Sequence, residues 1–306
     1  MPALVLILLS VAVAVIVALV ALRYPWHPGE AELAVGRRAG ESAQAHPRVL
    51  GTLARRLDPQ SATGLALSIA LGVVAVAGIV LGLLAYLVRT NARLASIDNS
   101  VAKWGNREAT PLSNHVLNGV TQLGSIYVVI VLAVVLAAAE LYRTGGRWIV
   151  PFVVAVVAGE EIVATVIKDI VDRTRPAFNP AAATLGPSFP SGHTTTAAAF
   201  YAACALLIGR RRPRAARAVL AGGAAGIAVA VASSRVLLDV HWLTDVIGGL
   251  ALGWAWFTLC SIAFGGRLLQ FGLVAEVAEQ VAESDGPVGE RLPNRTQAPK
   301  LGTPGA

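Results

Sequence analysis

The sequence predicts an all-α, polytopic membrane helical bundle. Of its 306 residues, 55% are hydrophobic and only 14% are charged, whereas a soluble domain carries about a quarter charged residues. The mean hydropathy is +0.65. Seven apolar runs follow one another, and they lack the period-2 alternation of a membrane β-barrel. These observations exclude an ordinary cytosolic enzyme, and they exclude disorder except at the chain ends.

The apolar runs define the expected helices in chain order. A helix needs about 20 residues to cross the hydrocarbon core, and most of the runs approach or exceed that length. The runs are 3–22, 64–88, 116–139, 148–167, 194–208, 218–232 and 242–264. Between the second and third runs, 89–115 is expected to be a partly helical loop at the surface.

The first run has two interpretations, a cleaved signal peptide or a retained helix. It lacks a basic segment before it and exceeds the apolar length of a typical signal peptide, so we expect a retained helix. The predicted organisation is an extra N-terminal transmembrane helix at 1–24, a cytoplasmic loop at 25–63, a six-helix core at 64–264 and a largely disordered cytoplasmic tail at 265–306.

Charge asymmetry predicts how the helices are oriented. The loop between the fifth and sixth runs carries five arginines and no acid, which indicates the cytoplasmic side. Alternation then places 17 of the 25 Lys and Arg residues inside. The net charge of +7 is explained by these loops, so we expect no nucleic-acid partner. The loops that join the fourth to the fifth run and the sixth to the seventh therefore face outward.

Those two outward loops contain polar residues suited to binding phosphate. Lys168 and Arg175 are two cations that would repel each other in one small volume unless an anion lay between them. Ser191 is expected to be the N-cap of the fifth helix, and Gly192 lets a ligand approach the backbone. The helix N-terminus at that point also favours an anion.

Two histidines complete the candidate site. His241 and Asp245 are four residues apart at the start of the seventh helix, where a carboxylate can orient the imidazole as a nucleophile or base. Arg235 adds a third cation, and His193 follows Gly192. This inventory predicts phosphoryl transfer in which His241 attacks phosphorus and His193 acts as acid and then as base. The oxygens would be held by Lys168, Arg175, Arg235, Ser191 and Gly192.

We expect neither a metal ion nor another cofactor. One carboxylate of the site is obviously paired, and cations crowd the place where a metal would bind. Cys204 and Cys260 lie inside apolar runs and indicate neither a disulfide framework nor a cysteine metal site.

Three motifs in this order resemble the signature of the type 2 phosphatidic acid phosphatase family, whose superfamily includes vanadium haloperoxidases and glucose-6-phosphatase. They are K-x6-R-P, P-S-G-H and S-R-x5-H-x3-D. Their fixed positions are Lys168, Arg175, Pro176, Pro190, Ser191, Gly192, His193, Ser234, Arg235, His241 and Asp245. The resemblance covers about 64–264. It implies a six-helix phosphatase core that hydrolyses lipid phosphomonoesters or diphosphates without metal, at the extracytoplasmic face of the cell membrane.

Other functions use the same features. A phosphotransferase would pass the phosphoryl group from the same site to another lipid or a sugar. A transporter would place charges along several helices at mid-depth, whereas most polar residues here gather in two loops. A haloperoxidase-like enzyme with a soluble substrate does not account for seven apolar runs. The sequence specifies neither the lipid nor the oligomeric state.

Five charged residues near the motifs are not part of them. Glu160 and Glu161 lie within an apolar run, where acids indicate function. Glu161 could support Lys168, and a hydrogen bond to another helix is an equal alternative. We expect Asp172, Arg173 and Asp239 to be solvated loop charges.

Overall fold

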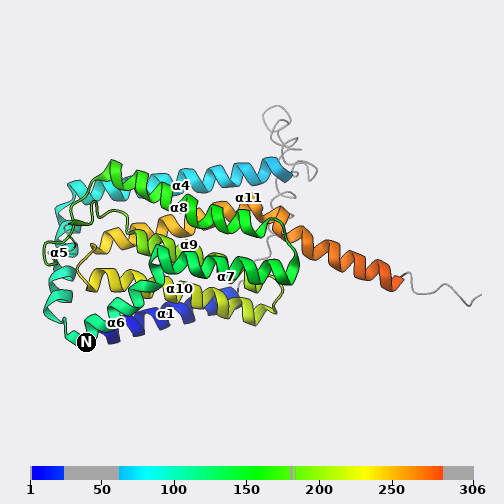
Figure 1. Ribbon diagram of the computed structural model, residues 1–306. Helices are drawn as coiled ribbons and strands as arrows, with labels where there is room; N and C mark the ends of the chain where they lie inside the picture. Colours follow the sequence, from blue (N-terminus) through cyan, green and yellow to red (C-terminus); the bar gives the residue numbers. More distant parts are fainter. Residues whose placement is uncertain (1, 24–61, 180–181, 183, 285–306) are drawn as a thin grey trace, which may run out of the picture. The chain divides into compact units, whose positions relative to one another are not determined.

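Helices make up most of the chain that the structure describes. The computed structural model describes residues 2–23, 62–179, 182 and 184–284. Within these ranges the chain forms α-helices and short 3-10 turns but no strand, which confirms the predicted all-α bundle (Figure 1). In chain order the helices are α1 (Pro2–Arg23), α4 (Ala62–Thr90), α5 (Ala92–Arg107), α6 (Pro111–Thr121), α7 (Ile126–Thr144), α8 (Ile149–Val171), α9 (Gly192–Gly209), α10 (Arg214–Leu237) and α11 (Leu243–Ser284).

Five of the described helices are long and apolar enough to cross a membrane, and the bent pair of α4 and α5 adds a sixth if it counts as one span. The fifth predicted run, now α9, is not among them. Its first turns carry His193 and three threonines, and Thr194 through Phe200 are buried among the other helices. Because α9 lies inside the bundle, it does not need the apolar surface of a helix that faces lipid.

The third predicted run forms two helices instead of one. A 3-10 turn, η2 (Gln122–Gly124), separates α6 from α7. A Cβ atom on Gly124 would lie 2.5 Å from the carbonyl oxygen of His193, so only glycine lets η2 approach the first turn of α9 so closely. The break therefore packs directly against the segment that carries a candidate catalytic histidine.

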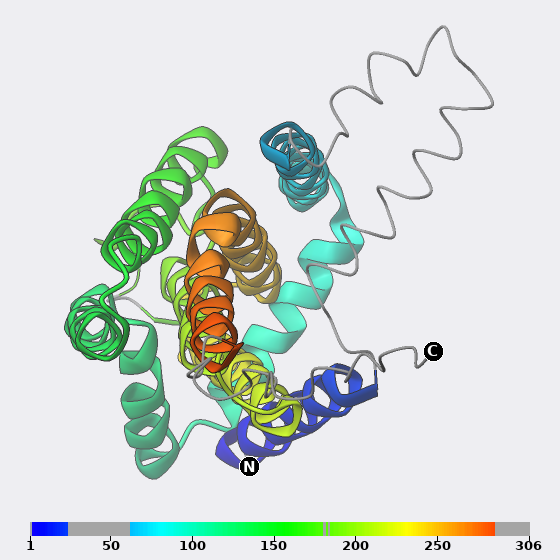
Figure 2. The same ribbon diagram turned by 90° about the vertical axis from the view of Figure 1, so that its right-hand side faces the viewer.

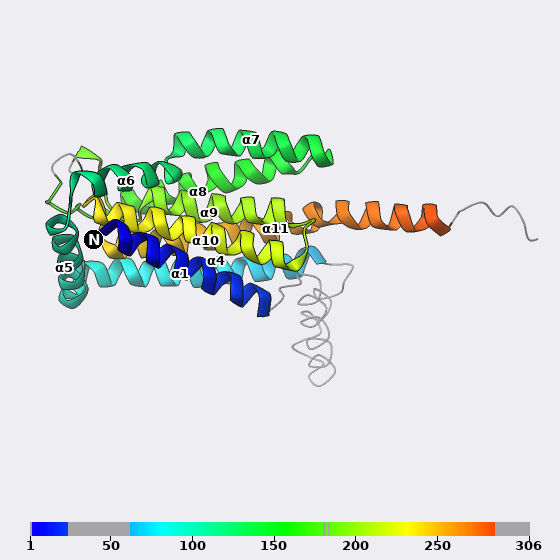
Figure 3. The same ribbon diagram turned by 90° about the horizontal axis from the view of Figure 1, so that it is seen from below.

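Helix α5 lies across one end of the bundle (Figures 1 and 3). The chain bends by 84° between α4 and α5. The side chain of Asn91 caps α5 by accepting hydrogen bonds from the backbone N–H groups of Arg93 and Leu94. One side of α5 buries Asp98, Ala102 and Gly105. This segment, expected to be a partly helical loop at the surface, is helical over most of its length and covers the end where the candidate site lies.

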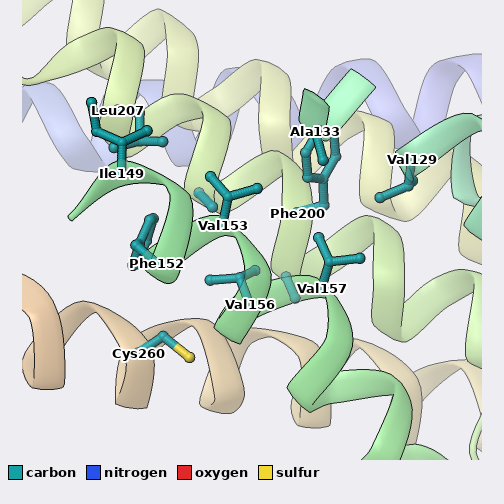
Figure 4. Packing of buried hydrophobic residues seen from close by; sticks show 12 residues of the cluster. Val129, Ala133, Ile149, Phe152, Val153, Val156, Val157, Phe200, Leu207 and Cys260 are labelled. Atoms are coloured by element: carbon teal, nitrogen blue, oxygen red, sulfur yellow. The ribbon is translucent and has the colours of Figure 1, made fainter. Parts of the chain in front are cut away.

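The main hydrophobic core joins four of the membrane helices (Figure 4). Phe152 and Val156 of α8 pack with Phe200 of α9, Val129 of α7 and Cys260 of α11, all of them buried. Because lipid tails are as apolar as these side chains, the helices associate here mainly through van der Waals packing. This core holds α8, α9 and α11 together beneath the loops that carry the motifs.

Helix α1 packs along α10 through small residues (Figure 2). A Cβ on Gly222 would collide with the carbonyl oxygen of Ala14, and one on Gly226 would lie 3.1 Å from the carbonyl oxygen of Ser10. Glycines spaced four apart allow two membrane helices to approach closely. The first apolar run thus forms a helix that contacts the predicted core.

The chain divides into two compact units, residues 1–269 and 270–306. The described part of the second unit is helical, since α11 continues to Ser284 beyond the predicted end of the last span at Phe264. Most of the predicted loop at 25–63 and the tail after Ser284 lie outside the described residues. The predicted domain boundaries remain predictions.

Candidate active site

The loop after α8 and the loop after α10 meet at the end of the bundle that α5 covers (Figure 1). The backbone N–H of Ser191 donates to the carbonyl of Asp245 at 3.1 Å. Arg175 Nη1 donates to the carbonyl of Val240 at 2.8 Å. Residues from the three sequence motifs therefore come together in one place, as the sequence predicts.

Lys168 reaches the N-terminus of α9. It lies in the last turn of α8, and a Cβ on Gly192 would lie only 3.1 Å from its ammonium nitrogen. The absence of a side chain at Gly192 thus leaves space for the ammonium group beside the first amides of α9. A positive charge and a helix N-terminus at the same point form a site for an anion.

Arg175 is held by the surrounding backbone. Its guanidinium donates to the carbonyls of Gly186 at 2.8 Å, Pro187 at 3.2 Å and Val240 at 2.8 Å. Burial lowers the pKa of Arg175 below its usual value, and Asp245 opposes this effect. An arginine remains protonated in proteins, so the group stays a cation with its planar fork fixed in direction.

The contact between Arg175 and His241 defines the tautomer of the imidazole. Arg175 Nη1 lies 3.1 Å from His241 Nε2. A guanidinium only donates hydrogen bonds, so Nε2 must accept with its lone pair and the ring proton must be on Nδ1. Burial lowers the pKa of His241 to about 4, with Asp245 acting in the opposite direction. At neutral pH the ring is therefore uncharged, and its Nε2 electron pair points at the Arg175 guanidinium.

Asp245 lies beside His241 but at a longer distance than a hydrogen bond needs. His241 Nδ1 and Asp245 Oδ2 are 3.5 Å apart, and Nδ1 has no hydrogen-bond partner among the described residues. Oδ2 instead accepts from the backbone N–H of Trp242 at 3.0 Å. We expected His241 and Asp245 to lie on one face of the same helix. His241 instead precedes α11, which starts at Leu243, so only Asp245 is helical. The carboxylate still faces the Nδ1 side of the ring.

Ser191, His193 and Arg235 complete the predicted set. Ser191 stands at the N-cap of α9, but its hydroxyl accepts from Thr194 Oγ1 at 3.0 Å and makes no capping bond to a backbone N–H. Arg235 holds the backbone of His241, since its carbonyl accepts the His241 N–H at 3.2 Å. Its guanidinium donates to Thr121 Oγ1 at 3.2 Å. His193 lies within electrostatic range of Lys168, Arg175, Arg235 and His241.

Sequence reasoning missed a second group of charged residues behind His241. The expectation that Arg173 is solvated is wrong, because its side chain is only 12% exposed. Arg173 donates to Asp245 Oδ1 at 2.5 Å and to Asp98 Oδ2 at 2.7 Å. Asp98 also accepts from the N–H of Thr244 at 3.0 Å and from its hydroxyl at 2.6 Å. Asp98 could have indicated this group, because it is an acid on the face of α5 that is buried.

The same expectation was wrong for Asp239 and right for Asp172. Asp239 is 6% exposed and has a φ of 54°, which is unusual for a residue other than glycine. The tight turn between α10 and His241 folds this side chain inward instead of exposing it. Asp172 is exposed.

Glu160, the neighbour of Glu161, makes a hydrogen bond to another helix. It is fully buried and accepts from Thr196 Oγ1 of α9 at 2.6 Å. No contact between Glu161 and Lys168 occurs among the described residues. Glu160 therefore joins α8 to α9 one helix turn below the site.

The arrangement is chemically suited to an anion that is attacked by an imidazole. Lys168, Arg175 and Arg235 supply positive charge, while His241 presents a lone pair held in direction by Arg175. Within the described ranges, no three His, Cys, Asp or Glu side chains form a group that could hold a metal ion.

Comparisons with known proteins agree with this site. A model of the PAP2 superfamily matches residues 148–268, which include every motif residue. Phosphatidylglycerophosphatase B of Bacillus subtilis (strain 168) is 32% identical over 182 residues, covering 58% of this chain and 87% of that protein.

A solved structure shares the fold as well as the sequence. The crystal structure of a transmembrane PAP2-type phosphatidylglycerolphosphate phosphatase from Bacillus subtilis has a TM-score of 0.57 and is 30% identical to this chain. The match covers 63% of this chain and 96% of the other. With the family model, the relative and the solved fold in agreement, this chain belongs to the PAP2 superfamily, as a membrane-embedded phosphatase.

Proposed function

We propose that this enzyme removes the terminal phosphate of a membrane lipid through a covalent phosphohistidine on His241. The observation that carries the proposal is the contact of Arg175 with His241 Nε2, because it leaves the lone pair of the imidazole beside a cationic group. The names of the two relatives make phosphatidylglycerophosphate the first substrate to test.

In the first step, His241 Nε2 attacks phosphorus and the bond from phosphorus to the lipid oxygen breaks. Lys168, Arg175, Arg235, the Ser191 hydroxyl and the Gly192 N–H stabilise the charge on the three equatorial oxygens. His193, protonated when the phosphate dianion is bound beside it, donates this proton to the departing lipid oxygen, so the lipid leaves as an alcohol. The new imidazolium keeps its proton on Nδ1, facing the carboxylate of Asp245.

In the second step, water replaces histidine on phosphorus. His193, now neutral, takes a proton from the attacking water. The bond from phosphorus to Nε2 breaks, and its electrons return to the imidazole as a lone pair. Inorganic phosphate leaves, and His241 recovers its neutral tautomer. No step requires a metal ion, so the cations of the protein carry the whole stabilisation of charge.

Phosphate release and trapping of the intermediate test this mechanism together. Purified protein in EDTA should release phosphate from phosphatidylglycerophosphate, and His241→Ala should lower kcat by on the order of 10³-fold or more. When the wild type is quenched during turnover of a substrate labelled in its terminal phosphate, part of the label should remain on the protein. This bound phosphate should be stable in alkali and labile in acid. His115→Ala, at an exposed histidine of α6, is the matched control and should keep full activity. Activity in His241→Ala, or activity that requires a divalent ion, contradicts the mechanism.

Inhibition by orthovanadate gives a second test of the same site. Vanadate adopts the five-coordinate geometry of phosphorus during in-line attack, and a site complementary to that state should bind it more tightly than phosphate. We expect Arg175→Lys to weaken vanadate inhibition, because lysine cannot keep the contacts to His241 and to the surrounding carbonyls that fix this cation beside the site. Equal inhibition of the variant and the wild type would exclude Arg175 from the oxygen-binding set.

We further propose that the site faces the extracytoplasmic side of the cell membrane. Support comes from the excess of Lys and Arg in the loops at the other end of the helices. A lipid phosphate would then reach His241 from the outer leaflet without leaving the bilayer.

A further inference from the structure

A polar hollow with a volume of about 330 Å³ lies next to the candidate active site. It is formed by the end of α5, the outer face of α6, the loop after α8 and the turn after α10. Arg235 and Val240 line it, and both also belong to the surroundings of His241. The hollow therefore begins where the proposed phosphate position ends. Its polar lining consists of Asn106, Asn114, Asn118, Asn179, Arg235 and Asp239.

Four carboxamides around one hollow suit a hydroxylated ligand. Each Asn side chain offers both a donor and an acceptor, which is what a hydroxyl group needs from its partners. Asn114 and Asn118 are one helix turn apart, so they present adjacent groups from the same face of α6. Phe178 adds an aromatic ring to the lining. An acyl or prenyl chain would gain nothing from these amides and would desolvate them.

Asp239 gives independent evidence that this hollow is built for a ligand. It lines the hollow, is 6% exposed, and its Oδ1 has no hydrogen-bond partner among the described residues. Burial raises the pKa of this carboxyl to about 6. Its backbone is in the left-handed region, at φ 54°. A buried carboxyl oxygen without a hydrogen-bond partner is costly to stability, and a ligand hydroxyl would supply the missing donor.

We propose that this hollow binds the hydroxylated headgroup of a lipid whose terminal phosphate lies at His241. The inference rests on the proposed function and adds a selectivity to it. The hollow has the volume of about 11 water molecules at roughly 30 Å³ each, which is room for a glycerol unit with its phosphodiester or for a sugar ring. Arg235 lies between the two sites and contacts both ends of such a headgroup. Lipids that carry phosphate directly on the diacylglycerol leave the hollow unused.

The experiment compares kcat/KM for phosphatidylglycerophosphate with kcat/KM for phosphatidic acid, which lacks the second glycerol. The wild type should prefer phosphatidylglycerophosphate by about tenfold, the effect of one or two hydrogen bonds. Asn118→Leu should remove most of that preference, because it should lower kcat/KM for phosphatidylglycerophosphate and leave kcat/KM for phosphatidic acid unchanged. The matched control is Asn99→Leu, an exposed asparagine of α5 whose amide donates to the carbonyl four residues earlier, as that of Asn118 does. It should keep the preference.

Asp239→Asn provides a second variant that keeps the shape and tolerates the left-handed backbone. It should also lower the preference while leaving hydrolysis of phosphatidic acid within about twofold of the wild type. A wild type without preference, or a preference unchanged in both Asn118→Leu and Asp239→Asn, overturns the headgroup site while the phosphatase stands. A wild type that hydrolyses neither lipid overturns the proposed function, and the headgroup site falls with it.

Discussion

Asp245 brings a carboxylate into a fully buried position, where each oxygen has its own partner. Oδ1 pairs with Arg173, and Oδ2 accepts the N–H of Trp242 while facing His241 Nδ1. Arg173 is shared with Asp98, which in turn is tied to the start of α11 through Thr244. Removing one member of a buried ion pair typically costs about 3–5 kcal/mol, because the remaining charge has no partner. The carboxylate that faces the imidazole is thus held in place by residues that cannot reach a substrate.

We expect Asp98→Asn to lower kcat by about tenfold with KM within about twofold of the wild type. The amide keeps the shape of Asp98 but removes its charge, so Arg173 is attracted to Asp245 alone and draws that carboxylate away from His241. The measurement is steady-state kinetics on vesicles, together with the melting temperature of the purified variant.

Asp172→Asn is the control for this effect. Asp172 is an exposed acid next to Arg173, in a backbone conformation that asparagine tolerates. It should behave as the wild type. If Asp98→Asn melts earlier but turns over substrate at the normal rate, Asp98 stabilises the fold and does not position Asp245.

The protonation of His241 gives a prediction with a defined sign. Its pKa of about 4 in the folded protein lies below the ordinary value of 6.5 because burial disfavours the charged ring. Between these values the unfolded chain binds a proton that the folded chain does not. The free energy of unfolding therefore falls as the pH drops from 6.5 towards 4. Over most of this range His241, the proposed nucleophile, stays neutral.

Nitrogen NMR of protein labelled at histidine can measure this titration directly, with His241→Gln identifying the resonance. We expect a midpoint well below 6.5 and a neutral spectrum, protonated at Nδ1, at pH 7. A midpoint at or above 6.5 would contradict both the burial of His241 and the tautomer that Arg175 implies.

Local patterns predicted some site residues and not others. His241, Asp245 and Arg175 stand in short motifs whose residue types suit phosphate chemistry, so the sequence indicated them. Arg173 lies 75 positions from Asp98 in the chain, and no local pattern relates the two. Its burial depends on how α5 crosses the end of the bundle, which is a tertiary event. Asp239 was missed for the same reason, since its turn becomes buried only when the surrounding loops close over it.

Among the elements, α1 and α10 pack closely through a feature that is visible in the sequence. Gly222 and Gly226 of α10 lie one turn apart and meet Ser10 and Ala14 of α1. Hydrocarbon chains of lipid compete with apolar side chains, so helices in a membrane associate mainly through close packing of small residues. This packing ties the N-terminal helix to the helix that carries Arg235.

Gly222→Ala should lower the free energy of unfolding by about 1–3 kcal/mol, because the new methyl group collides with the backbone of Ala14 and must push α1 away. Gly223→Ala is the matched control, since a Cβ there meets nothing within 4 Å. The two substitutions share any gain in helix propensity, so their difference in melting temperature in detergent isolates the contact. Equal melting temperatures would mean that α1 does not pack on α10.

Apolar patterning predicted where helices lie better than where they break. The run 116–139 is polar at its start but was expected to form one helix, yet the chain forms α6, η2 and α7 there. The break depends on the approach of Gly124 to His193, a contact between segments remote in sequence. By contrast, α10 extends its predicted run by a few residues at each end, and α8 extends its run at the C-terminal end, because polar residues at the membrane surface can remain helical.

At the scale of the molecule, each end of the helix bundle has a distinct charge pattern. The end with the motifs carries the anion-binding cations. At the other end Arg210 pairs with the buried Glu140 of α7 at 2.8 Å, and Arg143 pairs with the same acid at 3.1 Å. Arg211 and Arg212 are exposed in the turn after α9. This pattern matches the excess of positive charge expected of cytoplasmic loops.

Labelling of single cysteines in whole cells tests the resulting orientation. With Cys204 and Cys260 replaced by alanine, an impermeant maleimide should modify Asn99→Cys in intact cells and Arg211→Cys only after the membrane is opened. Both positions are exposed, so a difference between them reports the side of the membrane and not burial. Because Asn99 lies on α5, over the same end as His241, its label also reports the side on which lipid phosphate is hydrolysed. If Arg211→Cys alone were labelled in intact cells, the end of the bundle with His241 would face the cytoplasm, and phosphate would be released inside the cell.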